Sequence, residues 1–126
     1  MRTSKDGGIK SGFFRNESVV YSLPGRLNGF GIAIYSDGDS FHGEWKENER
    51  HGQGTYTWGQ GPGKGSVYKG SWEGNQRNGH GTLTYNNGDI YVGNWLNDNK
   101  HGHGKKTFKE SGKVEEGEWK DGKFVG

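Results

Sequence analysis

The five histidines of this 126-residue chain are candidate metal ligands. His80 and His103 hold the same position in two copies of a repeated pattern, and imidazole nitrogens of this kind are common zinc ligands. The preceding copy has Gln53 at this position, and the spacing supplies no third ligand. His51 and His101 precede the first glycine of the pattern, where they are predicted to form turns or hydrogen bonds. We therefore predict no metal and no cofactor.

The stretch most similar to a phosphate-binding loop is Gly59–Ser66, which reads GQGPGKGS. Lys64 is followed by Gly65, where a P-loop has serine or threonine, and no helix signal follows. This stretch is therefore predicted to be a long hairpin connection. Acidic residues such as Asp37 and Asp39 lie in predicted turns, and no Ser/His/Asp order or carboxylate pair is visible. The sequence predicts no catalytic residues and a protein that is not an enzyme.

The composition limits the kind of core and the kind of partner. Hydrophobic residues make up 26% of the chain, but aromatic residues make up 13%, so the core must be built largely from rings. The 17 basic and 15 acidic residues are dispersed, which argues against nucleic acid as a partner. The chain has no cysteine, no signal-peptide pattern and no apolar run near the roughly 20 residues that span a bilayer. These features predict a cytoplasmic protein.

The elements that position these residues recur along the chain. Trp45, Trp72, Trp95 and Trp119 are separated by 27, 23 and 24 residues. A period in this range indicates a repeat architecture. A gap of nine residues separates two glycines in three successive units, at Gly43 and Gly52, Gly70 and Gly79, and Gly93 and Gly102.

Each unit has the alternation of a β-hairpin. In the first strand an aromatic residue, a glycine and a tryptophan share one face, and polar residues share the other. The return strand places Gly52, Gly54, Tyr56 and Trp58 on the aromatic face by the same parity. A repeated strand glycine marks a close approach, so each is predicted to leave a slot for a tryptophan or tyrosine ring. These structural glycines are Gly43, Gly52, Gly54, Gly70, Gly79, Gly81, Gly93, Gly102 and Gly104.

The predicted fold is all-β: an elongated single-layer antiparallel sheet of consecutive β-hairpin repeats, with no helices in the repeat region. Tight turns at Asp37-Gly38 and Asn87-Gly88 are predicted to join the units. The predicted boundaries are an N-terminal arm at 1–17, a degenerate first unit at 18–40, a unit with an insertion in its joining loop at 41–67, units at 68–90 and 91–114, and an incomplete unit at 115–126.

The N-terminal unit departs from the pattern. Its first strand lies either at Ser18, Val20 and Ser22 or near Gly12 and Phe14, with an eight-residue insertion in the second case. Residues 1–14 are predicted to cap this unit, because end repeats of such arrays are usually atypical. Three apolar residues of the unit occupy the parity that is polar elsewhere: Phe30, Ile32 and Ile34.

The stretch Tyr91–Phe108, YVGNWLNDNKHGHGKKTF, resembles the MORN repeat (membrane occupation and recognition nexus). That repeat has the pattern Tyr-x-Gly-x-Trp, then His-Gly-x-Gly, then an aromatic residue before a glycine turn. The resemblance covers residues 41–126 and, in part, 28–40; Glu115 replaces the aromatic residue of the last unit. It implies a non-enzymatic scaffold or adaptor. Similar repeats occur in ciliary and cytoskeletal proteins, so the resemblance implies a cytoskeletal location, with a cilium or flagellar axoneme as the first expectation.

The predicted function is the capture of a protein partner on the aromatic face. A single-layer sheet lacks the second layer that domains usually have, so some of its rings should stay accessible. A helix or peptide from a partner would supply the missing layer. The predicted partner-binding residues are Trp45, Trp58, Trp72, Tyr85, Trp95, Phe108 and Trp119.

Three alternatives remain open from the sequence. The first is a phospholipid-binding module that uses lysines of the polar face, although glutamates interleave with them. The second is a non-catalytic targeting segment of an enzyme. The third concerns assembly: the last unit stops at Gly126, so its open strand edge could pair with a second copy or another partner.

Overall fold

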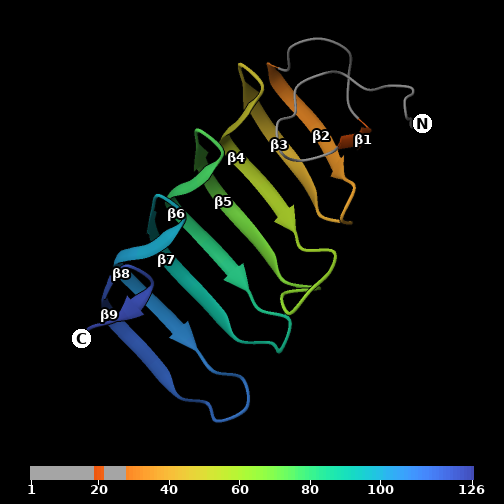
Figure 1. Ribbon diagram of the computed structural model, residues 1–126. Helices are drawn as coiled ribbons and strands as arrows, with labels where there is room; N and C mark the ends of the chain where they lie inside the picture. The colour runs from red at the N-terminus through yellow and green to blue at the C-terminus, as the bar shows by residue number, and fades with distance from the viewer. Residues whose placement is uncertain (1–18, 22–27) are drawn as a thin grey trace.

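The protein is a single open β-sheet. The computed structural model describes residues 19–21 and 28–126. They form one ten-stranded antiparallel sheet in which the strands follow one another in chain order (Figure 1). The described residues contain no helix, and so none that is long and apolar enough to cross a membrane. The predicted all-β single-sheet fold is therefore confirmed.

The strands pair as successive hairpins, β3 with β4, β5 with β6, β7 with β8, and β9 with β10. Each hairpin is joined to the next by an equally regular ladder, so the array has no break along its length. The bounds are β1 (Val19–Tyr21), β2 (Gly29–Tyr35), β3 (Ser40–Lys46), β4 (Glu49–Thr57), β5 (Val67–Glu73), β6 (Gln76–Thr84), β7 (Ile90–Leu96), β8 (Asn99–Thr107), β9 (Val114–Lys120) and β10 (Lys123–Phe124).

The hairpin turns lie earlier than the sequence predicted. The turn between β3 and β4 is Glu47-Asn48, and both residues have positive φ. Two positive φ values are the mark of a type I′ turn, whose twist matches that of the flanking strands. Of the two roles predicted for His51 and His101, turn formation is wrong, because they lie within β4 and β8. Equivalent two-residue turns are Gly74-Asn75, Asn97-Asp98 and Asp121-Gly122.

The first glycine of each Gly-x-Gly pair forms a bulge in the return strand. Gly43 pairs with Gly54 and Trp45 with Arg50, so β4 has two more residues than β3 over this interval. Gly52, Gly79 and Gly102 lie in these bulges with φ of 61°, 98° and 77°. A Cβ at Gly79 would lie 3.0 Å from Cβ of Ser71, on the polar face. These three glycines therefore supply backbone freedom, and the ring slot predicted for them is not present.

The second glycine of each pair lies under a ring of its own hairpin. A Cβ at Gly54 would overlap the ring of Phe41, and Gly81 and Gly104 have the same relation to Tyr68 and Tyr91. The glycine of the first strand lies directly opposite the second glycine of the pair, and a Cβ at Gly43 would lie 2.5 Å from Cα of Gly54. The close approach inferred from the sequence is thus a slot for the first aromatic residue of each unit.

The core is a continuous line of seven rings on one side of the sheet, which we call the aromatic zigzag. Successive centroids are 5.2–5.3 Å apart and the ring planes meet at 79–90°. This edge-to-face geometry suits the ring quadrupoles. Trp72 and Trp95 each contact the first aromatic ring of their own unit and that of the unit before it. In order, the zigzag is Trp45, Phe41, Trp72, Tyr68, Trp95, Tyr91 and Trp119.

Aspartates in the loops between units accept hydrogen bonds from the backbone of the next such loop along the array. Asp39 Oδ1 accepts a hydrogen bond from Gly59 N at 2.8 Å, and Asp89 Oδ1 accepts one from Lys109 N at 2.9 Å. Both aspartates are buried. The loop at 59–66 is a hairpin connection between β4 and β5, in which Trp58 N donates to Ser66 O. The acidic residues of the turns therefore have a structural role.

Replacing Asp89 by alanine is expected to lower the free energy of unfolding by about 1–3 kcal/mol, because it leaves the Lys109 N–H without its acceptor. Chemical denaturation monitored by tryptophan fluorescence would measure the change. Asp89→Asn is the control, since its amide oxygen can still accept this hydrogen bond. Equal losses in the two variants would show that the bond itself contributes little.

The N-terminal unit begins with β1, in which Val19 pairs with Tyr35 of β2. The predicted arm at 1–17, its capping role and the alternative first strand near Gly12 and Phe14 lie outside the described residues. Phe30, Ile32 and Ile34 do lie on the polar face, where they are 69%, 36% and 38% exposed.

Candidate functional site

The predicted partner-binding residues form two groups that differ in burial. Trp45, Trp72, Trp95 and Trp119 are buried, with 4–5% of their surface exposed. These four belong to the aromatic zigzag and are not available as a flat contact surface. Trp58, Tyr85 and Phe108 are half-buried, and the first two pack against the zigzag. We call these three the surface rings.

The surface rings occupy one equivalent position in each unit. β4, β6 and β8 end at Thr57, Thr84 and Thr107, and a surface ring follows each of them directly. The backbone N–H of each ring residue donates a hydrogen bond across the loop that leads to the next unit. The bonds are Trp58 N to Ser66 O at 3.0 Å, Tyr85 N to Asp89 O at 2.8 Å and Phe108 N to Lys113 O at 2.9 Å. The rings therefore recur once per unit on a backbone that regular hydrogen bonds hold in place.

A second regular feature crosses the same face. Arg50, Arg77 and Lys100 pair across the hairpins with Trp45, Trp72 and Trp95, and we call them the cation row. Each cation also lies over the tryptophan of the following unit, at 5.2, 4.5 and 5.1 Å from the ring centroid. Distances below about 6 Å are typical of cation–π contacts. In the sequence, each of these basic residues lies two positions before the bulge glycine of its unit. This regular spacing was a signal for the cation row that was not used in the prediction.

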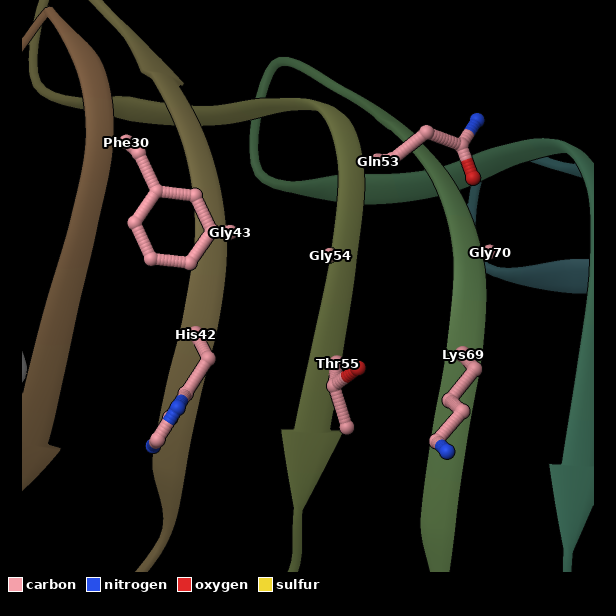
Figure 2. Close-up of a pocket in the computed structure, with 8 residues that line it drawn as sticks. All are labelled: Phe30, His42, Gly43, Gln53, Gly54, Thr55, Lys69 and Gly70. Carbon is pink, nitrogen blue, oxygen red and sulfur yellow. The ribbon is translucent and has the colours of Figure 1, made fainter.

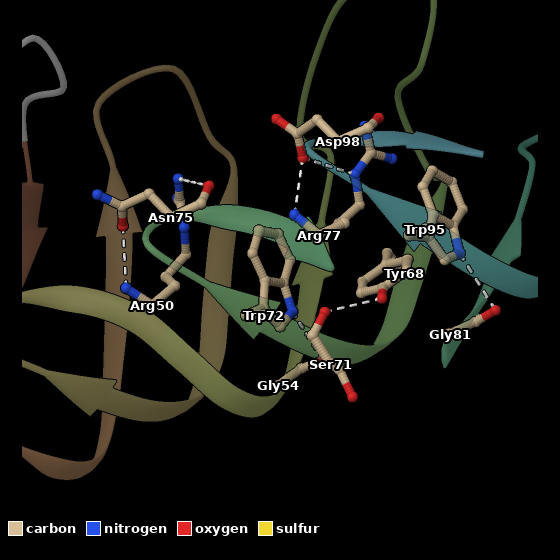
Figure 3. A network of polar contacts seen from close by, with 10 residues as sticks. All are labelled: Arg50, Gly54, Tyr68, Ser71, Trp72, Asn75, Arg77, Gly81, Trp95 and Asp98. Carbon is tan, nitrogen blue, oxygen red and sulfur yellow. Dashed lines mark hydrogen bonds and ion pairs between the residues drawn. The ribbon is translucent and has the colours of Figure 1, made fainter. Parts of the chain in front are cut away.

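The two arginines of the row have different hydrogen-bond partners (Figure 3). Arg50 is buried and donates from Nη1 to Tyr35 Oη at 3.0 Å and from Nη2 to Asn75 O at 3.2 Å. Arg77 forms an ion pair with Asp98, with Nε 3.0 Å from Oδ1. Within the described residues, Arg50 has no carboxylate partner and its Nε has no acceptor.

Lys100 is held by an aromatic hydroxyl. Its Nζ donates to Tyr85 Oη at 2.9 Å and lies 5.5 Å from the Tyr85 ring centroid. Burial lowers the pKa of Lys100, and the nearby positive charge of Arg77 lowers it further. The third position of the row is therefore a half-buried ammonium group beside a surface ring.

The tyrosines make stability fall at alkaline pH. Burial raises the pKa of Tyr91 to about 12 from 10.0, and burial also raises the pKa of Tyr68 and Tyr85. The folded state therefore keeps phenolic protons that the unfolded chain loses above pH 10, so the free energy of unfolding falls as pH rises past that point. Lys100 acts in the opposite direction, because its lowered pKa favours the folded state as pH approaches 10.5.

The melting temperature measured upward from about pH 9 is expected to fall, and to fall less steeply in Tyr91→Phe. A flat profile would contradict the burial of these hydroxyls.

A hollow of about 200 Å³ lies on the aromatic face between the hairpin β3–β4 and the hairpin β5–β6. It is smaller than the roughly 300–1,000 Å³ of typical small-molecule sites, so it suits one side chain of a partner. Its walls combine rings with two guanidinium groups and one carboxylate. The lining residues are Arg50, Tyr56, Trp58, Trp72, Asn75, Arg77 and Asp98.

The opposite, polar face has a different character (Figure 2). A hollow of about 370 Å³ lies beside Phe30, where the glycines thin the sheet, and His42, Gln53 and Lys69 also line it. Charges on this face are mixed, since Lys105 is paired across the ladder with Glu116. This alternation does not form a continuous basic surface for anionic lipid.

The two histidines that were considered as shared metal ligands lie on strands that are not adjacent. His80 lies in β6 and His103 in β8, with β7 between them. The two residues are therefore not neighbours in the sheet. His103 Nε2 instead lies 3.7 Å from Glu116 Oε2. Across the described residues no group of three or more His, Asp or Glu side chains could hold a metal ion.

Comparison with known families identifies the repeat. The MORN repeat model matches the chain five times, at residues 25–40, 41–62, 68–90, 91–113 and 116–126. A search of curated proteins found no match to this chain. The matched segments cover well over half of the sequence and contain the hairpins, glycines and rings described above. The chain therefore belongs to the MORN repeat family, whose repeats form non-catalytic modules that bind membranes or proteins.

Proposed function

We propose that this protein is an interaction scaffold that captures a segment of a partner protein on its aromatic face. The observation that carries the proposal is the repeated pairing of a half-buried surface ring with a cation on that face. Arg77 lies 5.7 Å from the Trp58 ring centroid, and Lys100 lies 5.5 Å from that of Tyr85. Aromatic and cationic groups of this kind are enriched at the centres of protein interfaces.

The shape of the sheet supports the same proposal. The aromatic zigzag lies on one side of the sheet, and in the described residues the partly buried rings of Tyr56, Trp58, Tyr85 and Phe124 pack against it. A bound helix or peptide would provide a second layer over these rings. The hollow between Arg50 and Arg77 would accept one side chain of that segment.

Affinity capture from cell lysate tests the proposed face. The variant Trp58→Ser/Phe108→Ser removes two surface rings, and partner proteins bound by the wild type should be lost from its captured set. The control is Ile90→Ser/Val92→Ser, which removes two apolar residues of the polar face that are 40% and 39% exposed. Circular dichroism would verify that both variants are folded. Loss of partners in the control, with retention in the ring variant, would place the site on the polar face.

Binding to anionic phospholipid is the second candidate, because MORN repeats include membrane-binding modules. The paired charges of the polar face lead us to expect weak binding there. Vesicle co-sedimentation with and without phosphatidylserine, at low and high salt, measures it. Strong binding that salt abolishes and the ring variant retains would favour the lipid function over protein capture.

We also propose that the protein acts in a cytoskeletal assembly, with a ciliary or flagellar axoneme as the first candidate. The support is its membership of the MORN family, in which such settings recur, and the elongated array suits a scaffold. A tagged copy should remain with the cytoskeletal fraction after detergent extraction. Complete release into the detergent-soluble fraction would count against this location.

A further inference from the structure

The cation row repeats at a regular interval, and from this we infer the chemistry of the partner. On the basis of the proposed function, we propose that the captured segment carries an acidic side chain for each cation of the row. Its carboxylates would follow one another at the spacing of the repeat units. The recognised partner is thus an acidic segment with a fixed charge period, and apolar residues of the same segment cover the surface rings.

The spacing follows from the sheet. Arg50, Arg77 and Lys100 lie in β4, β6 and β8, each two strands from the next. Two strand spacings amount to about 9.4–9.8 Å. In an α-helix, which rises 1.5 Å per residue, positions seven residues apart lie on the same face and are separated by about 10.5 Å, the same-face spacing that best matches the row. In a polyproline II helix three residues span about 9.3 Å and return to the same face. A β-strand fits less well, because residues three apart point to opposite faces.

The charge on this face calls for such a partner. Asp39 is buried and accepts hydrogen bonds from Tyr56 Oη and Gly59 N, and Asp89 is buried in its joint. Asp98 is engaged by Arg77. In the described part of the chain, no carboxylate forms an ion pair with Arg50 or Lys100. A carboxylate arriving from outside would make charge-assisted hydrogen bonds with Arg50 and Lys100, which are already partly desolvated in the fold. At Arg77 it would share the guanidinium group with Asp98, which occupies Nε and Nη2.

A neighbouring lysine, Lys106, adds positive charge near Lys100, the third residue of the cation row. Lys106 Nζ lies 4.4 Å from the ring centroid of Tyr85 and 4.7 Å from that of Phe108. Glu115 faces Lys106 across the ladder, and its carboxylate is also 3.5 Å from Lys113 Nζ. Two lysines therefore share one glutamate next to the surface rings. Burial lowers the pKa of Lys100 and the charge of Glu115 acts to raise it, but in the described residues Lys100 and Glu115 form no ion pair. The C-terminal half of the face is accordingly basic.

The row also gives the bound segment a direction. The fourth hairpin places Phe124 opposite Trp119, at the position that Arg50, Arg77 and Lys100 hold in the first three. Its ring packs on Trp119 with centroids 5.3 Å apart. A matching segment would have acidic residues facing three units and an apolar residue facing the fourth. A segment bound in the reverse direction would place an acid against a phenyl ring.

Selection from a displayed library of random peptides on the full chain tests this inference. Peptides enriched by the wild type should carry acidic residues seven apart or three apart, with an apolar residue at the next equivalent position. Both periods support the inference, because both place one carboxylate on each unit. The affinity of the selected peptides should fall with rising salt, as expected for charge pairs at a partly exposed surface.

Lys100→Phe is the decisive variant, since it makes the third unit like the fourth, which has Phe124 in this position. Its affinity for an acidic peptide selected by the wild type should be about tenfold lower. Peptides newly selected on the variant should lack the acidic residue that faces the third unit. The matched control is Lys105→Phe, which removes the same charge from the same strand on the polar face. Circular dichroism would establish that both variants fold, and the control should leave affinity and acid period unchanged.

Two results would overturn the inference. Enriched peptides without an acidic period would do so, as would an unchanged third acid after selection on a folded Lys100→Phe variant. If those peptides still fail to bind Trp58→Ser/Phe108→Ser, capture on the aromatic face stands and the acidic partner alone is wrong. If the wild type enriches no peptide that depends on the surface rings, the proposed function fails together with the inference.

Discussion

Replacing Gly81 by alanine is expected to lower the free energy of unfolding by about 3 kcal/mol or more, at the upper end of typical overpacking costs. The new Cβ would lie 2.5 Å from Cε1 of Tyr68 and closer still to the end of the ring. The ring cannot move aside, because it is fully buried with Trp72 and Trp95 each 5.3 Å away. Small domains have about 5–15 kcal/mol of stability in total, so one methyl group would remove much of it.

Equilibrium denaturation with tryptophan fluorescence would measure this loss, and Gly63→Ala is the matched control. A Cβ at Gly63 would have its nearest neighbour, in the Trp58 side chain, at 3.8 Å, which is ordinary contact. Its φ is not positive, so alanine is tolerated there and the free energy of unfolding should change little. If the two alanine variants were equally stable, the ring of Tyr68 would not be held over Gly81 as described.

Replacing Trp95 by alanine is expected to cost about 3–5 kcal/mol, the range measured when large buried rings are removed. Trp95 packs edge-to-face on Tyr68 of the preceding unit and Tyr91 of its own, and its Nε1 donates to Gly81 O at 3.3 Å. Arg77 would also lose the ring below it, at 4.5 Å. Because repeats contact mainly their neighbours, the loss should uncouple the two halves of the array as well as lower stability.

Thermal and chemical unfolding measured by two probes would detect this uncoupling as transitions that no longer coincide. Trp58→Ala is the control: the residue type is the same, but Trp58 is a half-buried surface ring, so the expected loss is smaller. Similar losses in the two variants would contradict the division of the tryptophans into core and surface. The division also decides how binding should be tested, since removing Trp72 and Trp95 would unfold the protein rather than expose a partner site.

Much of the architecture was predictable from the sequence because its signals are local. The alternation around Trp45, Trp72 and Trp95 determines which side of each strand is aromatic, and the regular glycines mark the return strands. Neighbouring hairpins then pair in chain order, which requires no long-range information. The turns were misplaced because Glu47-Asn48 contains no glycine, although both residues adopt positive φ.

The candidate site was predicted less completely, because burial depends on residues of the neighbouring unit. Trp58 and Trp72 share the same parity on adjacent strands, and nothing in their spacing separates surface from core. The cation row was missed for a related reason. Arg50 is a charged residue two places before a glycine, and its position over Trp72 exists only once the hairpins stand side by side.

The sequence by itself determined that the chain is an array of hairpins with one aromatic face, because strand alternation and glycine placement act over a few residues. The tertiary structure alone decided which rings fill the glycine slots, which rings remain at the surface, and where the cations lie among them. Each of these depends on packing between units, since the ring of one hairpin is buried by the tryptophan of the next.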